Sequence, residues 1–300
     1  MDCSSTSSNA TGSPTPQRRH KFWQTQPVKQ FEDKGNSTSL PESPIENPIA
    51  LSEVKKEPYK LAKNFEWVTC DVDSEEMMTE VYNFLTNNFV EDDNNMFRSD
   101  YSREFLRRVL SPPGYFKTWH IALRVISSKT PISFISGVPA RIRIRDDVVN
   151  MAEINFLCVH RKLRFKGLGP LMIKDLTRRV HSDNIWQAAY ATGSCYPNSR
   201  STSTQGFREM KFHDVPESIK AAYSLYNVST KTPLAQLMKD ALIMAKQKDY
   251  DVFNALDVMQ NESVFEELKC RIGDGRLHYY LYNYRINCEL KPSEIGLVLM

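Results

Sequence analysis

The sequence lacks long apolar runs, closely spaced cysteine pairs and a strong excess of charge of either sign. Apolar residues make up 41% of the 300, but charged residues interrupt them throughout, so we expect neither a membrane-spanning helix nor a signal peptide. The six cysteines show no CxxC spacing, which predicts free thiols in a reducing compartment and disfavours a zinc site. A formal net charge of +3 is too small to indicate nucleic-acid binding. These absences predict a globular protein with one large or two modest cores.

The most informative stretch runs from Glu153 to His181 and reads EINFLCVHRKLRFKGLGPLMIKDLTRRVH. Residues 154–159 are mostly apolar, β-branched or aromatic, which predicts a buried strand. A tight basic turn follows, and the apolar spacing after it predicts a helix over 170–182. The turn holds four cations and two glycines, namely Arg161, Lys162, Arg164, Lys166, Gly167 and Gly169.

A glycine turn that leads into a helix offers unpaired backbone N–H groups and the positive end of the helix dipole. Such a turn binds anions, and the neighbouring cations favour phosphate. Residues 164–169 also fit the pattern R/Q-x-x-G-x-G/A, by which the acetyltransferase-like superfamily holds the pyrophosphate of an acyl-coenzyme A. The pattern is short, so an ordinary basic surface turn is the alternative.

The strand, the turn and the TRRVH that follows closely resemble the signature of the N-myristoyltransferase family, whose members transfer myristate from coenzyme A to an N-terminal glycine. Other segments resemble the same family, in the family's order. They are HKFWQTQPV from His20, FVEDDNNMFRSDYS from Phe89, KAAYSLYNV from Lys220, FNALDVM from Phe253, GDGRLHYYLYNYRI from Gly273 and the final EIGLVLM. The family's chains are longer than this one, so the resemblance implies that a block is missing between Gly193 and Lys220.

The resemblance implies an α+β acyltransferase fold of the acetyltransferase-like (GNAT) type, with two related halves of which the second is incomplete. It divides the chain into a disordered tail and linker over 1–58 with a coenzyme-contacting segment at 20–28, an N-terminal acyl-CoA-binding half over 59–193, a bridge over 194–219, and the remnant of a C-terminal peptide-binding half over 220–300.

The strand pattern predicts a meander of antiparallel strands at 119–126, 132–137 and 140–145, with a turn around Pro139. Residues 197–205 are polar and serine-rich, which predicts a surface bridge unsuited to a core. Strands after this bridge are expected to lack neighbours, which would expose sheet edges and apolar surface.

The resemblance assigns the chemistry to backbone groups and a chain end. The N–H groups of Phe156 and Leu157 would polarise the thioester carbonyl as an oxyanion hole, which requires a strand distortion that frees these donors from ladder bonds. The terminal carboxylate on Met300 would be the general base. From the residues alone, an ordinary core strand and an ordinary strand end are the alternatives. Cys158 is expected to be a packed strand residue, and His160 and His181 are expected to be structural.

The resemblance also assigns contacts to the two substrates. The coenzyme contacts are His20, Lys21, Phe22, Trp23, Leu157, Cys158, Val159, Arg164, Phe165, Lys166, Gly167, Leu168 and Gly169. The peptide contacts are Glu91, Asp92, Asp93, Asp274 and Gly275. Without the resemblance, the acidic run at 91–93 would be a solvated surface. The family usually has a serine and an arginine at the positions of Phe165 and Gly167, so weaker coenzyme binding is expected.

The implied function is protein N-myristoylation, with myristoyl-CoA as the acyl donor and no metal. The alternative is a catalytically inactive acyl-CoA- or peptide-binding paralogue, or the product of a decaying gene copy. A general acetyltransferase is disfavoured because the resemblance extends along the chain. The expected partners are N-terminal glycine peptides and nascent proteins, with ribosome association, in the cytoplasm. Neither a nucleic acid nor a transmembrane segment is expected.

Overall fold

The computed structural model describes residues 22–29, 41–89, 101–193, 201–212, 219–224, 227–259 and 261–297. The chain divides into two compact units. The first comprises Met1–Ile45, Ile142–Val148 and Ala191–Val298, and the second comprises Glu46–Arg141, Val149–Tyr190 and Leu299–Met300. Within the described ranges, none of the helices combines the length and the hydropathy that a membrane crossing needs.

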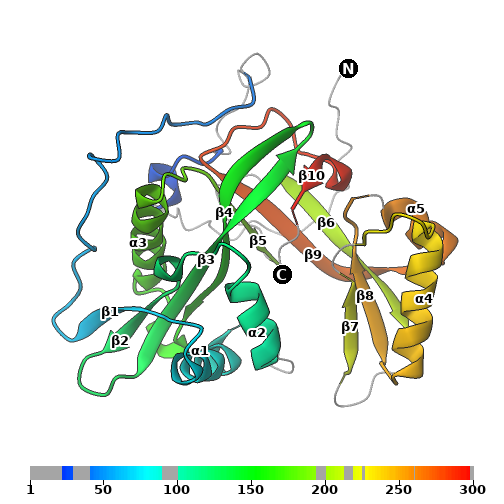
Figure 1. Cartoon of the computed structure of the whole chain (residues 1–300), viewed down its shortest axis with the longest axis horizontal. Coiled ribbons are helices and arrows are strands. Elements are labelled where there is room, and N and C mark those ends of the chain that lie inside the picture. The colour runs from blue at the N-terminus through cyan, green and yellow to red at the C-terminus, as the bar shows by residue number, and fades with distance from the viewer. Residues whose placement is uncertain are drawn as a thin grey trace, which may run out of the picture. The chain divides into compact units, whose positions relative to one another are not determined.

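The second unit is built on a mixed sheet whose strands neighbour one another in chain order (Figure 1). The strands are β1 (Phe65–Thr69), β2 (Ile121–Val125), β3 (Pro131–Ile144), β4 (Asp147–Val159) and β5 (Ala188–Thr192). β1 and β2 pair antiparallel, as do β2 and β3, whereas β4 and β5 are parallel. The helices are α1 (Glu75–Asn88), α2 (Arg103–Leu110) and α3 (Leu168–Ser182). One-turn helices η3 (Lys117–Trp119) and η4 (Arg161–Leu163) precede β2 and follow β4.

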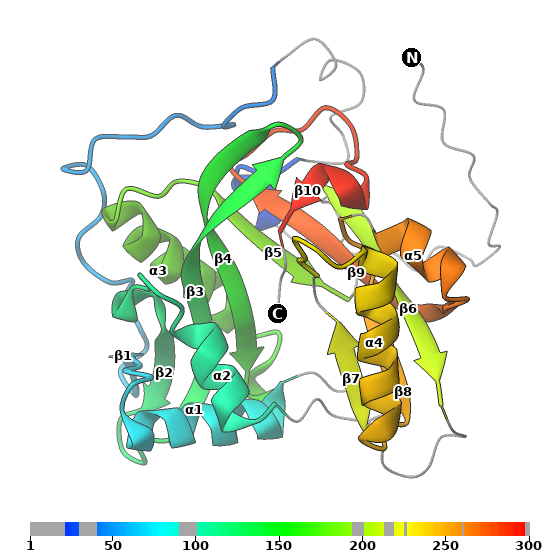
Figure 2. The same ribbon diagram turned by 45° about the vertical axis from the view of Figure 1, so that its right-hand side comes forward.

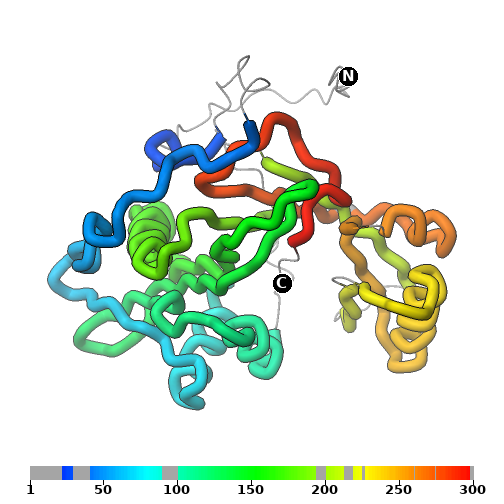
Figure 3. The backbone as a smooth tube through the Cα atoms, turned by 45° about the horizontal axis from the view of Figure 1, so that its top comes forward, coloured from blue at the N-terminus to red at the C-terminus, as the bar shows by residue number. Residues whose placement is uncertain are grey.

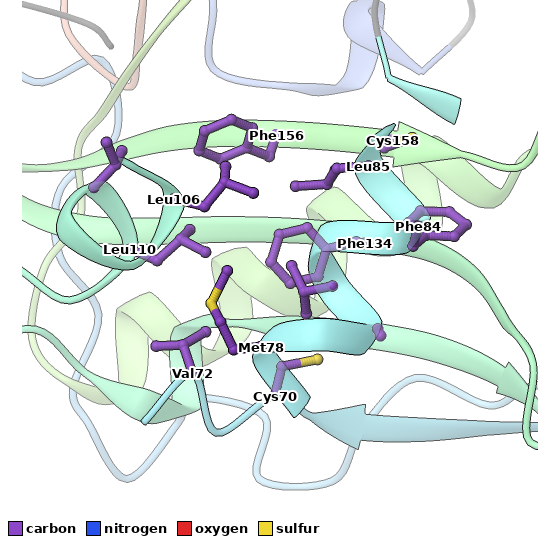
Figure 4. Packing of buried hydrophobic residues seen from close by; sticks show 13 residues of the cluster. Cys70, Val72, Met78, Phe84, Leu85, Leu106, Leu110, Phe134, Phe156 and Cys158 are labelled. Carbon is purple, nitrogen blue, oxygen red and sulfur yellow. The ribbon is translucent and has the colours of Figure 1, made fainter. Parts of the chain in front are cut away.

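Helices α1 and α2 cover one face of this sheet. Ser74 caps α1 by accepting the N–H of Met77, and Ser102 caps α2 in the same way. Their apolar residues recur at helical spacing and enter a core that also receives Phe134 from β3 and Phe156 from β4 (Figure 4). The unit therefore holds β4 directly beneath two helices.

Helix α3 covers the opposite face, where Met172 and Leu176 are fully or almost fully buried. Its Asp175 is also fully buried and accepts hydrogen bonds from Arg178 at 2.9 Å and from Arg179 at 3.0 Å. A buried carboxylate needs such partners, because an unpaired one would be strongly destabilising. This unit thus has three layers, with the strands between two helical layers.

The main strands of the first unit have the neighbour order β9-β6-β8-β7. Its strands are β6 (Ser203–Lys211), β7 (Ala221–Ser224), β8 (Val252–Leu256) and β9 (Arg271–Tyr282). Helices α4 (Leu234–Gln247) and α5 (Asn261–Glu267) pack on β8 through a shared apolar cluster, and Figure 2 shows α4 lying along the strands. The short β10 (Ile295–Gly296), which follows η5 (Pro292–Glu294), pairs antiparallel with Arg143 and Ile144 at the end of β3.

The N-terminal segment 22–29 belongs to the first unit and contains η1 (Trp23–Thr25). It lies beside the chain that follows β9 (Figure 3). The ammonium of Lys29 donates to the carbonyl oxygens of Ile286 at 3.0 Å and Asn287 at 3.1 Å, and the N–H of Asn283 donates to Pro27 at 2.8 Å. This segment is therefore an anchored part of the fold.

The prediction of a turn around Pro139 is wrong, because β3 is continuous from Pro131 to Ile144 and the hairpin turn follows it. Proline lacks an N–H and is tolerated in a strand only where no ladder bond is lost. The pairing of β2 with β3 ends at Ile121 with Ile135, and Ile121 is the first residue of β2, so Pro139 lies beyond the start of β2. One edge of β3 has no β2 partner there, and the missing N–H costs little.

The prediction that 197–205 is unsuited to a core is also wrong for its last residues. Residues 203–205 begin β6, which has β9 on one side and β8 on the other. Ser203 and Gln205 are fully buried, and within the described ranges neither side chain has a hydrogen-bond partner. Backbone pairing on both edges has overridden an unfavourable composition. Residues 194–200 of the predicted bridge lie outside the described ranges.

Candidate active site

The basic turn forms a tight link between β4 and α3. His160 caps η4 by accepting the N–H of Lys162 at 3.3 Å. Phe165 then adopts a positive φ of 63°, and its side chain is 97% exposed. Gly167 is the N-cap of α3 with φ 79° and ψ 7°, a left-handed conformation that favours glycine. The backbone of the turn therefore requires a glycine at position 167.

The start of α3 fits the anion site that the sequence predicts. Gly167 offers no side chain to cap the helix, so the N–H groups of its first turn remain available to a ligand. A Cβ built on Gly169 would meet no atom within 4 Å, so the space above this turn is open. Lys162 and Lys166 are exposed beside it. These groups suit the pyrophosphate of a coenzyme A substrate.

Arg164 differs from the other cations of the turn because its guanidinium is partly buried and already engaged. It donates to the carbonyl oxygen of Asn88 at 2.8 Å and to that of Val159 at 3.4 Å. Asn88 is the last residue of α1, where carbonyl groups lack helical partners and the dipole favours a cation. Arg164 thus joins the end of α1 to the end of β4, a structural role that the sequence did not indicate.

Strand β4 is distorted at Phe156, whose φ of 55° lies far from the extended region. Ala152 and Ile154 face α3, as alternation requires, but Phe156 and Cys158 face α1 and α2 while Leu157 faces α3. The change of face between Ile154 and Phe156 means that one extra residue is inserted in the strand, as in a β-bulge. Strand β4 therefore departs from regular geometry at the residue where the oxyanion-hole hypothesis requires a distortion.

The pairing of β4 with β5 stops just before this bulge. Ala152 is opposite Ala188 and Glu153 is opposite Ala189, and β4 continues to Val159 beyond these pairs. Backbone groups on that edge beyond Glu153 have no partner in this ladder, so the bulge lies where donors can face a ligand.

Two aromatic rings pack against the ring of Phe156 on the α1 and α2 face of the sheet. The ring centroids of Phe89 and Tyr101 lie 5.5 and 5.9 Å from that of Phe156. These two residues flank residues 90–100, so the predicted acidic residues Glu91, Asp92 and Asp93 lie outside the described ranges. Phe89 and Tyr101, the described residues on either side of 90–100, are therefore next to the bulge.

The thiol and the imidazoles near this site are structural. Cys158 is 3% exposed, and burial raises the pKa of its thiol to about 12, which makes it a poor nucleophile. Burial lowers the pKa of His181 to about 4, and its ring lies 4.3 Å from that of Trp186. Both residues behave as the sequence predicts. Among the described residues, no group of three or more His, Cys, Asp or Glu side chains is arranged to hold a metal ion.

The remaining predicted contacts fall in the first unit or outside the described ranges. Trp23 is 8% exposed and packs against Phe22, with ring centroids 5.1 Å apart. Asp274 and Gly275 lie in β9, and a Cβ on Gly275 would come within 2.9 Å of the Phe207 ring, so packing explains this glycine. His20, Lys21 and Met300 lie outside the described residues.

The mixed sheet, its two helical layers and the bulged strand leading into a glycine-capped helix define a GNAT-like acyltransferase fold. Residues 44–203 match the family model described as Myristoyl-CoA:protein N-myristoyltransferase, N-terminal domain, and residues 216–298 match the model of its C-terminal domain. The chain belongs to the myristoyl-CoA:protein N-myristoyltransferase family.

Relatives and solved structures agree with this assignment. The chain is 46% identical to glycylpeptide N-tetradecanoyltransferase 1 of Arabidopsis thaliana, over 94% of this chain and 90% of the relative. It is 38% identical to the glycylpeptide N-tetradecanoyltransferase of Dictyostelium discoideum, over 94% of this chain and 92% of the relative. The Saccharomyces cerevisiae N-myristoyltransferase with bound myristoyl-CoA is 26% identical, with a TM-score of 0.76 over 92% of this chain and 94% of that chain.

The Arabidopsis comparison extends over 390 residues, whereas this chain has 300, so the relative contains residues that have no counterpart here. The two family-model matches leave only residues 204–215 between them. The prediction of an internally shortened family member is confirmed.

Proposed function

We propose that the chain transfers myristate from myristoyl-CoA to the N-terminal glycine of proteins. The bulge of β4 at Phe156 carries this proposal, because it presents backbone N–H groups beside a turn suited to a pyrophosphate. A strand that served only the core would have no need of an L-residue at a positive φ. The family membership fixes the acyl donor and acceptor class.

In this scheme the start of α3 and the cations of the turn bind the pyrophosphate of the coenzyme. The N–H groups of Phe156 and Leu157 donate to the thioester oxygen and stabilise the negative charge that develops there during attack. The amine nitrogen of the glycine forms an amide bond with the acyl carbon. The carbon–sulfur bond breaks, and the proton that the nitrogen loses as the amide forms goes to the leaving sulfur, so coenzyme A departs as its thiol.

The amine must lose a proton before it attacks, because an α-amino group has a pKa of about 8 and is largely protonated at neutral pH. The carboxylate of Met300 is the proposed base for that proton. Glu91, Asp92 and Asp93 are proposed to attract basic residues of the acceptor, an effect that salt would weaken. The coenzyme contacts of His20, Lys21, Phe22 and Trp23 and the peptide contacts of Asp274 and Gly275 belong to the same proposal.

The proposed acceptors are N-terminal glycine peptides and nascent proteins in the cytoplasm, reached on or near the ribosome.

The proposal is tested by single-turnover transfer of labelled myristate from myristoyl-CoA to a peptide that begins with glycine. A matched peptide that begins with alanine is the control, because a branched Cα hinders the approach of the amine to the thioester. Transfer to the glycine peptide alone is the expected result. Tight binding of myristoyl-CoA without any transfer would contradict the proposal and would favour an inactive binding protein.

A further inference from the structure

Ser136 lies on β3, next to the bulge of β4. Ser136 is 1% exposed, and its hydroxyl donates to the carbonyl oxygen of Asn155 at 3.0 Å. A strand carbonyl is usually bonded to a backbone N–H of the neighbouring strand, but the extra residue of a bulge disrupts this pairing. The serine hydroxyl supplies a side-chain donor to the carbonyl of the residue before Phe156.

This hydrogen bond fixes the direction of one peptide group. The carbonyl of Asn155 and the N–H of Phe156 belong to the same peptide bond, which is trans. In a trans peptide the C=O and the N–H point in opposite directions. A carbonyl held toward Ser136 on β3 therefore directs the N–H of Phe156 toward the other edge of β4, where pairing with β5 has ended at Glu153.

We propose that Ser136 is a positioning residue for acyl transfer. Its hydroxyl holds the peptide between Asn155 and Phe156 so that the N–H of Phe156 donates to the thioester oxygen. This inference rests on the proposed function, which makes the thioester the substrate. A phenylalanine at φ 55° is in a sparsely populated region, so the peptide would rotate toward a more common conformation once the serine bond is removed.

The same strand offers a matched control. Ser133 is fully buried, and its hydroxyl contacts the sulfur of Met172 on α3 at 3.1 Å, so it bonds no backbone group of β4. Ser133→Ala and Ser136→Ala remove the same atom from the same buried strand. Only the second change releases the peptide before Phe156.

The kinetic experiment compares Ser136→Ala, Ser136→Thr and Ser133→Ala with the unmodified chain. We expect Ser136→Ala to lower kcat by roughly tenfold to a hundredfold with an unchanged KM for myristoyl-CoA, because a misdirected oxyanion donor acts on the transition state. Ser136→Thr, which keeps the hydroxyl, should restore most of the rate. An unchanged kcat in Ser136→Ala, or an equal loss in Ser133→Ala, would overturn the proposal.

A second readout needs no turnover. Without an acceptor peptide, difference infrared spectroscopy of bound myristoyl-CoA labelled with carbon-13 at the thioester carbonyl reports the hydrogen bond to that oxygen. We expect a lowered stretching frequency in the unmodified chain and in Ser133→Ala, and a higher one in Ser136→Ala. If the band is lowered in the unmodified chain and shifts back in Ser136→Ala, but no transfer occurs, the proposed function fails while the positioning of the Phe156 N–H by Ser136 stands. If Ser136→Ala leaves the band unmoved, the role of Ser136 fails.

Discussion

At the scale of single residues, Gly167 and Gly169 lie two positions apart but meet different constraints. Gly167 has a positive φ, whereas Gly169 lies within the first turn of α3 and faces open space. The first glycine serves the backbone, and the second keeps room for whatever approaches the helix start.

Alanine substitutions separate the two requirements. Gly167→Ala should lower the free energy of unfolding by about 1–2 kcal/mol, because a Cβ is strained in the left-handed region. Gly169→Ala should leave the free protein as stable or up to about 1 kcal/mol more stable, because alanine is the better helix former. Urea unfolding measures both effects, and calorimetry with myristoyl-CoA should show weaker binding by Gly169→Ala. Unchanged binding by that variant would contradict the anion site.

His120 makes stability depend on pH. It is fully buried, and its Nε2 lies 2.7 Å from the carbonyl oxygen of Leu110. Burial lowers its pKa from 6.5 to about 4, so the folded protein keeps this ring neutral while the unfolded chain takes up a proton below pH 6.5. Stability contributed by the neutral ring is complete above pH 6.5 and is lost as the pH falls toward 4.

We therefore expect the free energy of unfolding to fall by about 2 kcal/mol between pH 7 and pH 5 through His120 alone. His120→Gln should remove this part of the dependence, as measured by urea unfolding at both pH values. His181, whose pKa burial also lowers to about 4, adds a loss in the same direction. A slope that is identical in His120→Gln and the unmodified chain would show that the ring titrates normally in the folded state.

At the scale of elements, the segment from β4 to α3 was the most predictable part of the chain. The strand, the basic turn and the helix all form, and Gly167 has the conformation that a glycine there suggests. Local pattern decides these features, because apolar periodicity and turn residues act over a few positions. Helix α2 was not predicted, since its eight residues are too few to give a strong periodic signal.

Features that depend on distant partners escaped prediction. Strand β6 is polar at its start and exists because β8 and β9 pair with both of its edges. The continuity of β3 through Pro139 depends on the start of β2 at Ile121, beyond which β3 has no β2 partner. The bulge at Phe156 was expected only from the family resemblance, because nothing in the letters INFL distinguishes a bulged strand from a regular one.

Arg164 and Lys166 should separate fold from binding at the basic turn. Arg164→Ala should lower the free energy of unfolding by about 1.5–3 kcal/mol. The guanidinium donates charge-assisted hydrogen bonds to carbonyl oxygens at the end of α1 and at the end of β4, and both are lost. Lys166→Ala should leave stability unchanged and weaken myristoyl-CoA with a flatter salt dependence, because an exposed cation acts on the ligand phosphates. Urea unfolding and calorimetry at two salt concentrations give these values. Equal loss of stability in both variants would contradict this division.

At the scale of the whole molecule, the first unit has large apolar side chains in contact with water. Tyr223, Val228 and Ile272 are 62%, 74% and 76% exposed. The unit also buries Ser203 and Gln205 without hydrogen-bond partners, which lowers its stability. Ser203 ends the first family-model match, Gln205 lies between the two matches, and the three exposed residues lie within the second match.

We expect the purified protein to bind a hydrophobic dye through this unit. Val228→Lys and Ile272→Lys should each reduce the dye fluorescence, because they place a charge on exposed apolar surface. Leu51→Lys is the matched control, since Leu51 is 52% exposed but belongs to the second unit. If Leu51→Lys reduces the dye fluorescence as much as the other two changes do, the dye does not bind specifically to the first unit, and the prediction is wrong.

The bulge of β4 has a consequence for how such a site can be gained or lost. If Asn155 were deleted, Ile154 and Leu157 would still face α3, and Phe156 would still face α1, because one fewer residue restores regular alternation. A one-codon deletion would thus keep both cores and relax the backbone at Phe156, while removing the carbonyl that Ser136 holds. We expect a protein that folds at least as well and transfers no acyl group, which urea unfolding and the single-turnover assay would measure together. In the proposed function, the oxyanion donors thus depend on one inserted residue that the packing of the two cores does not require.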